Sequence, residues 1–258
     1  MSKIRVGVQV HQNHTTYESY AKAISTIDQI GVDTIWNWDH FFPMYGEENG
    51  HHFEGWTLLT AMAMLTKQAE IGCLVLCNSY RNPAMLSQMA KTLDHISGGR
   101  LILGLGSGWF EKDYTEYDFE FGTALSRLQD LDKSLPIIKH RWEIDLPKPM
   151  RNPIPILIGG SGEKVTLRIT AQYADMWNSF GPAETYKHKN GVLNNWCEKL
   201  GRDPNEIERT IMVGRDNLDQ LDDFVEAGAT HVMISVNDEP WQFDAVEKLV
   251  KWRDSVNG

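Results

Sequence analysis

Two adjacent residues, Asp39 and His40, stand directly after a short apolar segment, Thr34–Trp38. Imidazole titrates near neutral pH, so a histidine in such a place can accept or donate a proton during a reaction. Neighbouring side chains on an extended segment point in opposite directions, so the two residues are expected to do different work. A single histidine is more often structural, but a position at the end of a predicted strand favours proton transfer.

A glycine-rich loop follows a second apolar segment, Leu101–Leu105. It contains Gly106, Ser107 and Gly108 and leads directly into Trp109. Glycine has no Cβ, so a ligand or another stretch of backbone can approach such a loop closely. The aromatic and acidic residues that come next are typical of a pocket wall, and we expect a functional site at the end of this strand.

A second glycine turn, the residues Gly159, Gly160, Ser161 and Gly162, lies between a predicted strand and a predicted helix. Backbone N–H groups and a helix N-terminus at such a turn favour an anion. The surrounding stretch from Lys139 to Arg168 carries six Lys/Arg residues against three acidic ones, in a chain whose net charge is −10. The turn is therefore the best candidate for an anion site, although a tight turn and solvated helix faces would explain the same residues.

Three of the nine tryptophans follow or end predicted strands at one level: Trp38, Trp109 and Trp177, the last beside Asn178. Indoles that share the mouth of a pocket would offer a flat surface to an aromatic ligand. The alternative for each one is a place in the core.

The elements that must position these residues alternate regularly. Eight apolar segments predict strands, namely Ile4–Val10, Thr34–Trp38, Glu70–Leu76, Leu101–Leu105, Ile156–Ile158, Asp175–Asn178, Glu206–Val213 and Thr230–Val236. Eight predicted helices lie between and after them, which gives about 32 residues per unit, the size expected of a (β/α)8 TIM barrel. A doubly wound open sheet would show the same alternation but usually has fewer strands. We predict one barrel domain over residues 1–258, with the site at the C-terminal ends of its strands.

Composition narrows the function. The acidic net charge argues against nucleic-acid binding. Because the chain has only three cysteines, a disulfide framework of the kind found in secreted proteins is unlikely. No apolar run is long enough to cross a bilayer, and the N-terminus enters a strand pattern without a signal-like segment. We expect a cytoplasmic chain without membrane contact. Arg5, Asp33 and Glu70, at strand beginnings, are expected to be ordinary solvated positions.

The sequence resembles the bacterial luciferase-like flavin and deazaflavin oxidoreductases over nearly its whole length. The resemblance rests on WNWDHF at 36–41, YRNPA at 80–84, LDHISGGR at 93–100, GLGSGW at 104–109, IGGSGEK at 158–164 and YADMWN at 173–178. The Asp-His pair and the GGSGEK turn are most similar to the branch that uses coenzyme F420, an anionic 5-deazaflavin. The family fold is a (β/α)8 barrel.

The resemblance implies roles for individual residues. Asp39 would contact the deazaflavin, with His40 near its reactive carbon. Leu74 and Val75 match the position of a non-prolyl cis peptide behind the ring. The backbone and hydroxyl groups around Gly106, Ser107, Gly108 and the Gly159–Gly162 turn would hold the phosphate and side chain, with Trp177 and Asn178 nearby. We expect His40 to move a proton during hydride transfer, with Asp113 or Glu111 as its helper.

The chain also departs from the family pattern, since Met44 stands where some members have tryptophan. This leaves the small-molecule substrate open. We also expect a homodimer.

Two alternatives remain. An FMN-dependent monooxygenase of the same family would share the barrel and the anion site. A metal-dependent barrel hydrolase or isomerase would draw its ligands from His11, His14, His40, His51 and His52. Barrel metal sites need ligands on several strand ends, and the strands before Gly159 and Trp177 end without them, so we expect no metal.

Overall fold

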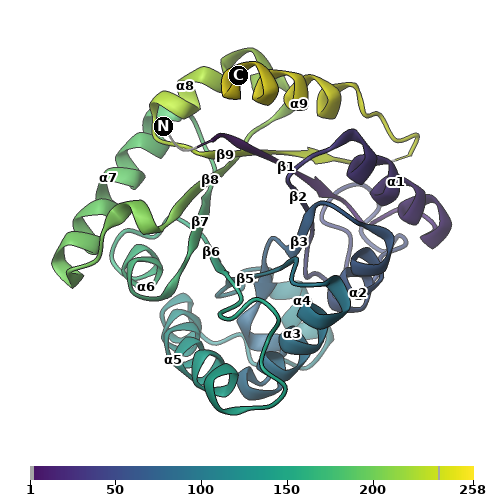
Figure 1. The fold of residues 1–258 in the computed structure, drawn as a ribbon. Helices are drawn as coiled ribbons and strands as arrows, with labels where there is room; N and C mark the ends of the chain where they lie inside the picture. The colour runs from purple at the N-terminus through teal and green to yellow at the C-terminus, as the bar shows by residue number, and fades with distance from the viewer. Residues whose placement is uncertain (1–2, 238) are drawn as a thin grey trace.

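The computed structural model describes residues 3–237 and 239–258, and it shows a closed ring of parallel strands surrounded by helices (Figure 1). The strand order is β3-β2-β1-β9-β8-β7-β6-β5-β4, and β3 also pairs with β5, which closes the ring. The predicted (β/α)8 barrel is therefore confirmed. No helix in the described ranges is long and apolar enough to cross a membrane.

The strands are β1 Arg5–Val10, β2 Thr34–Asn37, β3 Glu70–Cys73, β4 Leu76–Cys77, β5 Leu101–Gly106, β6 Ile156–Gly159, β7 Met176–Ser179, β8 Glu208–Met212 and β9 His231–Val236. The α-helices are α1 Tyr17–Ile30, α2 Gly55–Leu65, α3 Pro83–Ser97, α4 Glu111–Glu116, α5 Ala124–Ile144, α6 Thr166–Tyr173, α7 Ala183–Leu200, α8 Leu221–Glu226 and α9 Asp244–Asn257. Short 3₁₀ turns follow β4, α7 and β8 at 78–80, 204–206 and 215–220.

Glycines end several helices. Gly31 after α1 has φ of 91° and Gly228 after α8 has φ of 99°, a left-handed conformation that favours glycine. The short helix α4 begins three residues after the glycine loop that follows β5. Its first turn contains Glu111 and Asp113, and acidic residues there interact favourably with the helix dipole.

The third strand of the barrel is broken into β3 and β4 at a cis peptide bond between Leu74 and Val75. This is the position at which the resemblance to the family implied such a bond. The Leu74 carbonyl accepts a hydrogen bond of 2.9 Å from the Gln9 side chain. A Cβ at Gly106 would lie 2.6 Å from Val75 Cγ2, and one at Gly159 would lie 2.9 Å from Val75 Cγ1. The two glycines therefore make room for the Val75 side chain.

The apolar core has two layers. A small cluster fills the barrel interior, formed by Trp36, Leu74, Ile102, Leu157, Met176 and Met233. A larger cluster lies between the strands and the helices, and Trp177 belongs to it. Its fully buried indole stacks on Tyr186 of α7, with ring centroids 5.1 Å apart. Trp177 therefore points away from the barrel mouth, so the prediction that it presents a face to a ligand is wrong.

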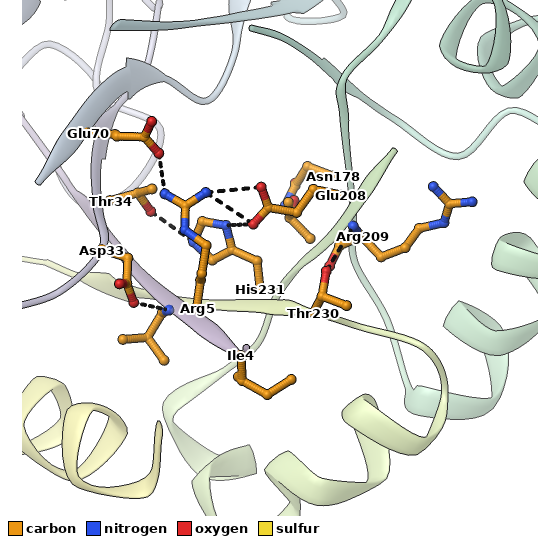
Figure 2. A network of polar contacts seen from close by, with 12 residues as sticks. Ile4, Arg5, Asp33, Thr34, Glu70, Asn178, Glu208, Arg209, Thr230 and His231 are labelled. Carbon is orange, nitrogen blue, oxygen red and sulfur yellow. Dashed lines mark hydrogen bonds and ion pairs between the residues drawn. The ribbon is translucent and has the colours of Figure 1, made fainter. Parts of the chain in front are cut away.

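Ion pairs close the barrel at the N-terminal ends of the strands (Figure 2). Arg5 of β1 pairs with Glu70 of β3 and with Glu208 of β8, and His231 Nδ1 lies 3.0 Å from Glu208 Oε1. Asp33 accepts a 2.7 Å hydrogen bond from the Val6 backbone. Ion pairs and hydrogen bonds therefore join Arg5, Asp33 and Glu70 to neighbouring strands. The expectation that these three residues are ordinary solvated positions is wrong.

Candidate active site

Two adjoining hollows open at the C-terminal ends of the strands. The first has a volume of about 260 Å³ and the second about 420 Å³. Four residues line both of them: His40, Leu74, Trp109 and Phe180. Such a pair of connected hollows at the C-terminal face is the usual place for barrel chemistry, and it provides space for two ligands side by side.

Most of the predicted site residues line the first hollow. They are Asp39, His40, Leu74, Val75, Gly106, Ser107, Gly108, Gly159, Gly160 and Asn178. The Asn178 amide is buried and donates a 2.9 Å hydrogen bond to Thr210 Oγ1. Ser161 and Gly162 follow Gly160 outside this lining, and Asp113 lies behind His40. The predicted site residues that line this hollow thus come from the ends of five different strands of the barrel.

His40 is held by a buried carboxylate. Its Nδ1 lies 2.7 Å from Asp113 Oδ2, and the Asp113 side chain has no exposed surface. Asp113 also accepts hydrogen bonds from the Phe41 backbone N–H, at 3.1 Å, and from the Tyr80 hydroxyl, at 3.2 Å. Burial, with Cys77 and Asp113 nearby, raises the pKa of Tyr80, so this hydroxyl remains a donor. The Asp113 carboxylate accepts from the Phe41 N–H and the Tyr80 hydroxyl, and it is an acceptor toward His40 as well. The Nδ1 atom of His40 therefore carries the proton, and Nε2 is the free basic nitrogen.

Glu111 lies two residues before Asp113 on α4, but it is exposed and does not line either hollow. Of the two acids that the sequence offered as a helper for His40, the structure places Asp113 against it and Glu111 away from it.

Asp39 is held by a residue that sequence reasoning did not single out. Arg81 Nη1 and Nη2 donate to the two Asp39 carboxylate oxygens at 2.7 and 2.9 Å, and the Cys77 backbone N–H donates at 2.9 Å. Arg81 also donates to Glu54 at 2.7 Å. Burial opposes the charge on Arg81, but Asp39 and Glu54 outweigh it and raise its pKa.

Glu54 completes this chain of contacts by capping α2, since its carboxylate accepts from the Trp56 and Thr57 backbone N–H groups. The ends of β2 and β4 and the start of α2 are therefore joined by one charged network. The signal available in the sequence was the YRNPA segment, but nothing in the spacing paired Arg81 with a residue 42 positions earlier.

The glycine turn after β6 has the backbone shape that glycine allows. Gly160 has φ of 120°, its N–H donates to the Asn178 carbonyl at 3.0 Å, and its own carbonyl accepts from the Trp177 indole at 2.8 Å. Trp177 thus supports the turn from behind. Helix α6 begins only at Thr166, beyond Gly162.

The expected local positive field at this turn is partly cancelled. Arg141, Arg151 and Arg168 pair with Asp145, Glu70 and Asp132, respectively. Arg151 moreover lies at the opposite end of the barrel, beside Glu70. The charge count along the chain therefore did not predict where the charges lie in space.

The second hollow is bordered by histidines and aromatic rings. The His11 and Trp38 ring centroids are 4.2 Å apart, and the Trp38 indole donates to His52 Nε2 at 3.0 Å. Burial, together with the positive charge of Arg215, lowers the pKa of His11 to about 4. Burial also lowers the pKa of His52 to about 4, with His40 contributing. These two imidazoles are neutral at pH 7.

The histidines of the metal-dependent alternative do not converge. His14 Nε2 is bonded to the Tyr45 carbonyl at 2.8 Å, and His52 Nε2 to the Trp38 indole. Across residues 3–237 and 239–258, no three His, Cys, Asp or Glu side chains are grouped so that they could hold a metal ion.

Comparison with known proteins gives the family. The pattern of the luciferase-like monooxygenases matches residues 1–215. The chain belongs to this family. It is 34% identical to the F420-dependent glucose-6-phosphate dehydrogenase of Amycolatopsis mediterranei over 119 residues, which are 46% of this chain and 35% of that protein. It is 29% identical to the phthiodiolone/phenolphthiodiolone dimycocerosates ketoreductase of Mycobacterium tuberculosis over 226 residues, 76% of this chain and 57% of that one.

This luciferase-like chain spans 35% and 57% of the length of these two curated relatives. Two of the solved structures that resemble it are matched over nearly their full length. An F420-dependent secondary alcohol dehydrogenase in complex with an F420-acetone adduct has a TM-score of 0.84 at 16% identity, with 98% of each chain covered. The tetrahydromethanopterin reductase of Methanopyrus kandleri has a TM-score of 0.78 at 14% identity, with 96% and 97% covered. These likenesses establish the shared fold.

Proposed function

We propose that the protein is a coenzyme F420-dependent oxidoreductase that transfers a hydride between the deazaflavin and a small organic substrate. The observation that carries the proposal is the first hollow, where Val75 of the cis peptide forms one wall and His40, held by Asp113, stands at the edge. Several of the relatives and two of the solved neighbours are named as F420-dependent enzymes, which supports this choice of cofactor.

The residues of the first hollow fit such a cofactor. Its wall combines apolar side chains at Leu74 and Val75 with backbone at Gly106 and Gly159, which suits a flat ring. Polar atoms follow on one side, at Ser107 and at the Gly160 turn, where a phosphate and side chain would be held. Ser161 and Gly162 continue this turn outward.

A bound deazaflavin supplies two-electron hydride transfer. The protein must place the substrate and handle the accompanying proton. His40 Nε2 can accept the hydroxyl proton of an alcohol, or donate a proton to a carbonyl oxygen in the reverse direction. Asp113 holds the imidazole in one tautomer and stabilises the imidazolium that forms, as a buried carboxylate does beside a catalytic histidine.

Asp39 has a different task in this account. It borders the first hollow, but Arg81 and the Cys77 N–H occupy its carboxylate oxygens. We therefore assign it to fixing the segment that carries His40 against the floor of the cofactor site.

A fluorescence titration of the purified protein with F420 and with FMN tests the proposal. F420 should bind more tightly, and Gly160→Leu should weaken its binding at least tenfold, about 1.4 kcal/mol. Gly191→Leu is the matched control, because Gly191 lies on α7 with open space around its Cα. Preferential binding of FMN would contradict the choice of cofactor, and undiminished F420 affinity in folded Gly160→Leu would contradict its placement.

We further propose that the protein is a cytoplasmic homodimer. Light scattering of the purified protein would test the dimer through its molar mass.

A further inference from the structure

The second hollow gathers large aromatic side chains that are unusually exposed. Tyr45, Trp109 and Phe180 are 63%, 64% and 62% exposed, and all three line this hollow. They come from three separate loops, after β2, β5 and β7. Exposed apolar surface that converges on one concavity marks a binding site rather than an accident of folding.

In the described part of the chain, the lining of the second hollow contains no acidic side chain, and its only basic side chains are histidines. His11, the other histidine there, is neutral at pH 7 because burial and the charge of Arg215 lower its pKa to about 4. An anionic ligand would therefore have no cationic side chain lining the second hollow to compensate for its lost hydration.

One cationic group, Arg215, stands near the wall of this hollow and lowers the pKa of His11. Its Nε donates to the Ser235 carbonyl at 3.2 Å, its buried Nη2 has no hydrogen-bond partner among the described residues, and its side chain does not line the hollow. The positive field of Arg215 would favour an anion, so the test below includes it.

We propose that the second hollow binds an uncharged, ring-bearing alcohol, or the carbonyl compound that it forms, with its ring among Tyr45, Trp109 and Phe180 and its oxygen toward His40. This rests on the proposed function, whose substrate class it names. In the oxidising direction the carbinol carbon gives up its hydride to the oxidised deazaflavin. The hydroxyl proton passes to His40 Nε2, and the C–O bond becomes C=O. The reverse step consumes the reduced cofactor and one proton.

The volume of the hollow, about 420 Å³, is within the range of small-ligand pockets. Met44 is part of its wall and does not line the first hollow. A larger side chain at Met44 should therefore reduce the space for the substrate and leave the cofactor site unchanged.

Calorimetric titration of the cofactor-free protein with acetophenone and with phenyl phosphate tests this inference. Acetophenone should bind at least tenfold more tightly than phenyl phosphate. Tyr45→Ala and Met44→Trp should each weaken acetophenone binding at least tenfold. Tyr17→Ala is the control, because Tyr17 is a half-exposed ring on α1 that lines neither hollow.

Phenyl phosphate binding as tight as acetophenone, or tighter, overturns the inference, and loss of that binding in Arg215→Met would identify Arg215 as the anion receptor. Absence of acetophenone binding at millimolar concentration also overturns it. The F420 titration separates the two proposals: acetophenone binding without F420 binding contradicts only the proposed function, and F420 binding without acetophenone binding contradicts only this inference.

Discussion

His40 Nδ1 lies 2.7 Å from the Oδ2 atom of Asp113, a carboxylate with no exposed surface. The two residues are 73 positions apart in the chain and belong to different βα loops. Through this contact the loop after β5 fixes the ring that faces both hollows from the end of β2. Removal of water from the contact strengthens it and holds the imidazole in one orientation.

Asp113→Asn should therefore lower turnover roughly 10²- to 10⁴-fold while cofactor affinity changes little, because the amide fills the same space but can no longer stabilise an imidazolium. His40→Asn should give a similar loss. Single-turnover rates and separate cofactor titrations distinguish the two effects. Glu111→Gln is the control and should remain near wild type, and equal losses in all three variants would contradict the assignment to Asp113.

Arg81→Met should destabilise the fold by about 3–5 kcal/mol, since it leaves the buried Asp39 carboxylate without its partner. Arg81→Lys should recover only part of this loss, because an ammonium group cannot form the two parallel hydrogen bonds. Urea unfolding measures both. Arg168→Met, which breaks the more exposed pair with Asp132, should cost about 1 kcal/mol or less. Similar losses of unfolding free energy at Arg81 and Arg168 would contradict the prediction that the buried Asp39 network contributes more to stability than the exposed pair.

Gly106→Ala should destabilise the protein by about 1–3 kcal/mol, because its Cβ would lie 2.6 Å from Val75 Cγ2. In the double variant with Val75→Ala the two costs should not add, since the second change removes the clash. Gly191→Ala serves as the comparison and should stabilise α7 by up to about 1 kcal/mol, because alanine favours helix and nothing lies near its Cβ. Additive costs at Gly106 and Val75 would mean that the two residues do not share this space.

Stability should fall as the pH drops from about 6.5 towards 4, in part because of His11. Its folded-state pKa of about 4 lies below the ordinary value of 6.5, so the folded protein favours the neutral ring. The stabilisation is complete above the unfolded pKa and is lost as the pH falls through this window, up to about 3 kcal/mol.

His11→Phe keeps a ring beside Trp38 but cannot titrate, so its free energy of unfolding should change less across this window. The measurement is urea unfolding at several pH values. His140→Phe, at an exposed position on α5, should follow the wild-type curve. An unchanged slope in His11→Phe would rule out His11 as a source of the pH dependence.

The fold was predictable because apolar segments and helix-ending glycines such as Gly31 and Gly228 recur along the chain. The orientation of Trp177 was not. Strands of a parallel barrel are apolar on both faces, so no alternation shows which neighbour points inward. In β7 it is Met176 and Asn178 that face the interior and the first hollow, and Trp177 that faces the helices.

The site was predictable in its strand-end residues and in the cis bond at Leu74–Val75, which depended on resemblance to the family. The partners of those residues were not predictable. Arg81 and Glu54 reach Asp39 from other loops, and the pairing depends on how those loops pack rather than on spacing. The count of charges along the chain also gave a wrong picture of the field at the glycine turn. Arg151 belongs to the basic stretch around that turn in the sequence, but it pairs with Glu70 at the other end of the barrel.

A crystal structure of the protein grown with F420 would test the proposed cofactor site. We expect the ring of the deazaflavin in the first hollow against Val75, with His40 Nε2 facing the open side of the ring and the phosphate beside Ser107 and Gly160. The larger hollow at the N-terminal ends of the strands, about 880 Å³ and lined by Arg5, Arg151 and Arg209, offers an alternative position. F420 bound there, or in the first hollow with its ring turned away from Val75 and His40, would contradict the account.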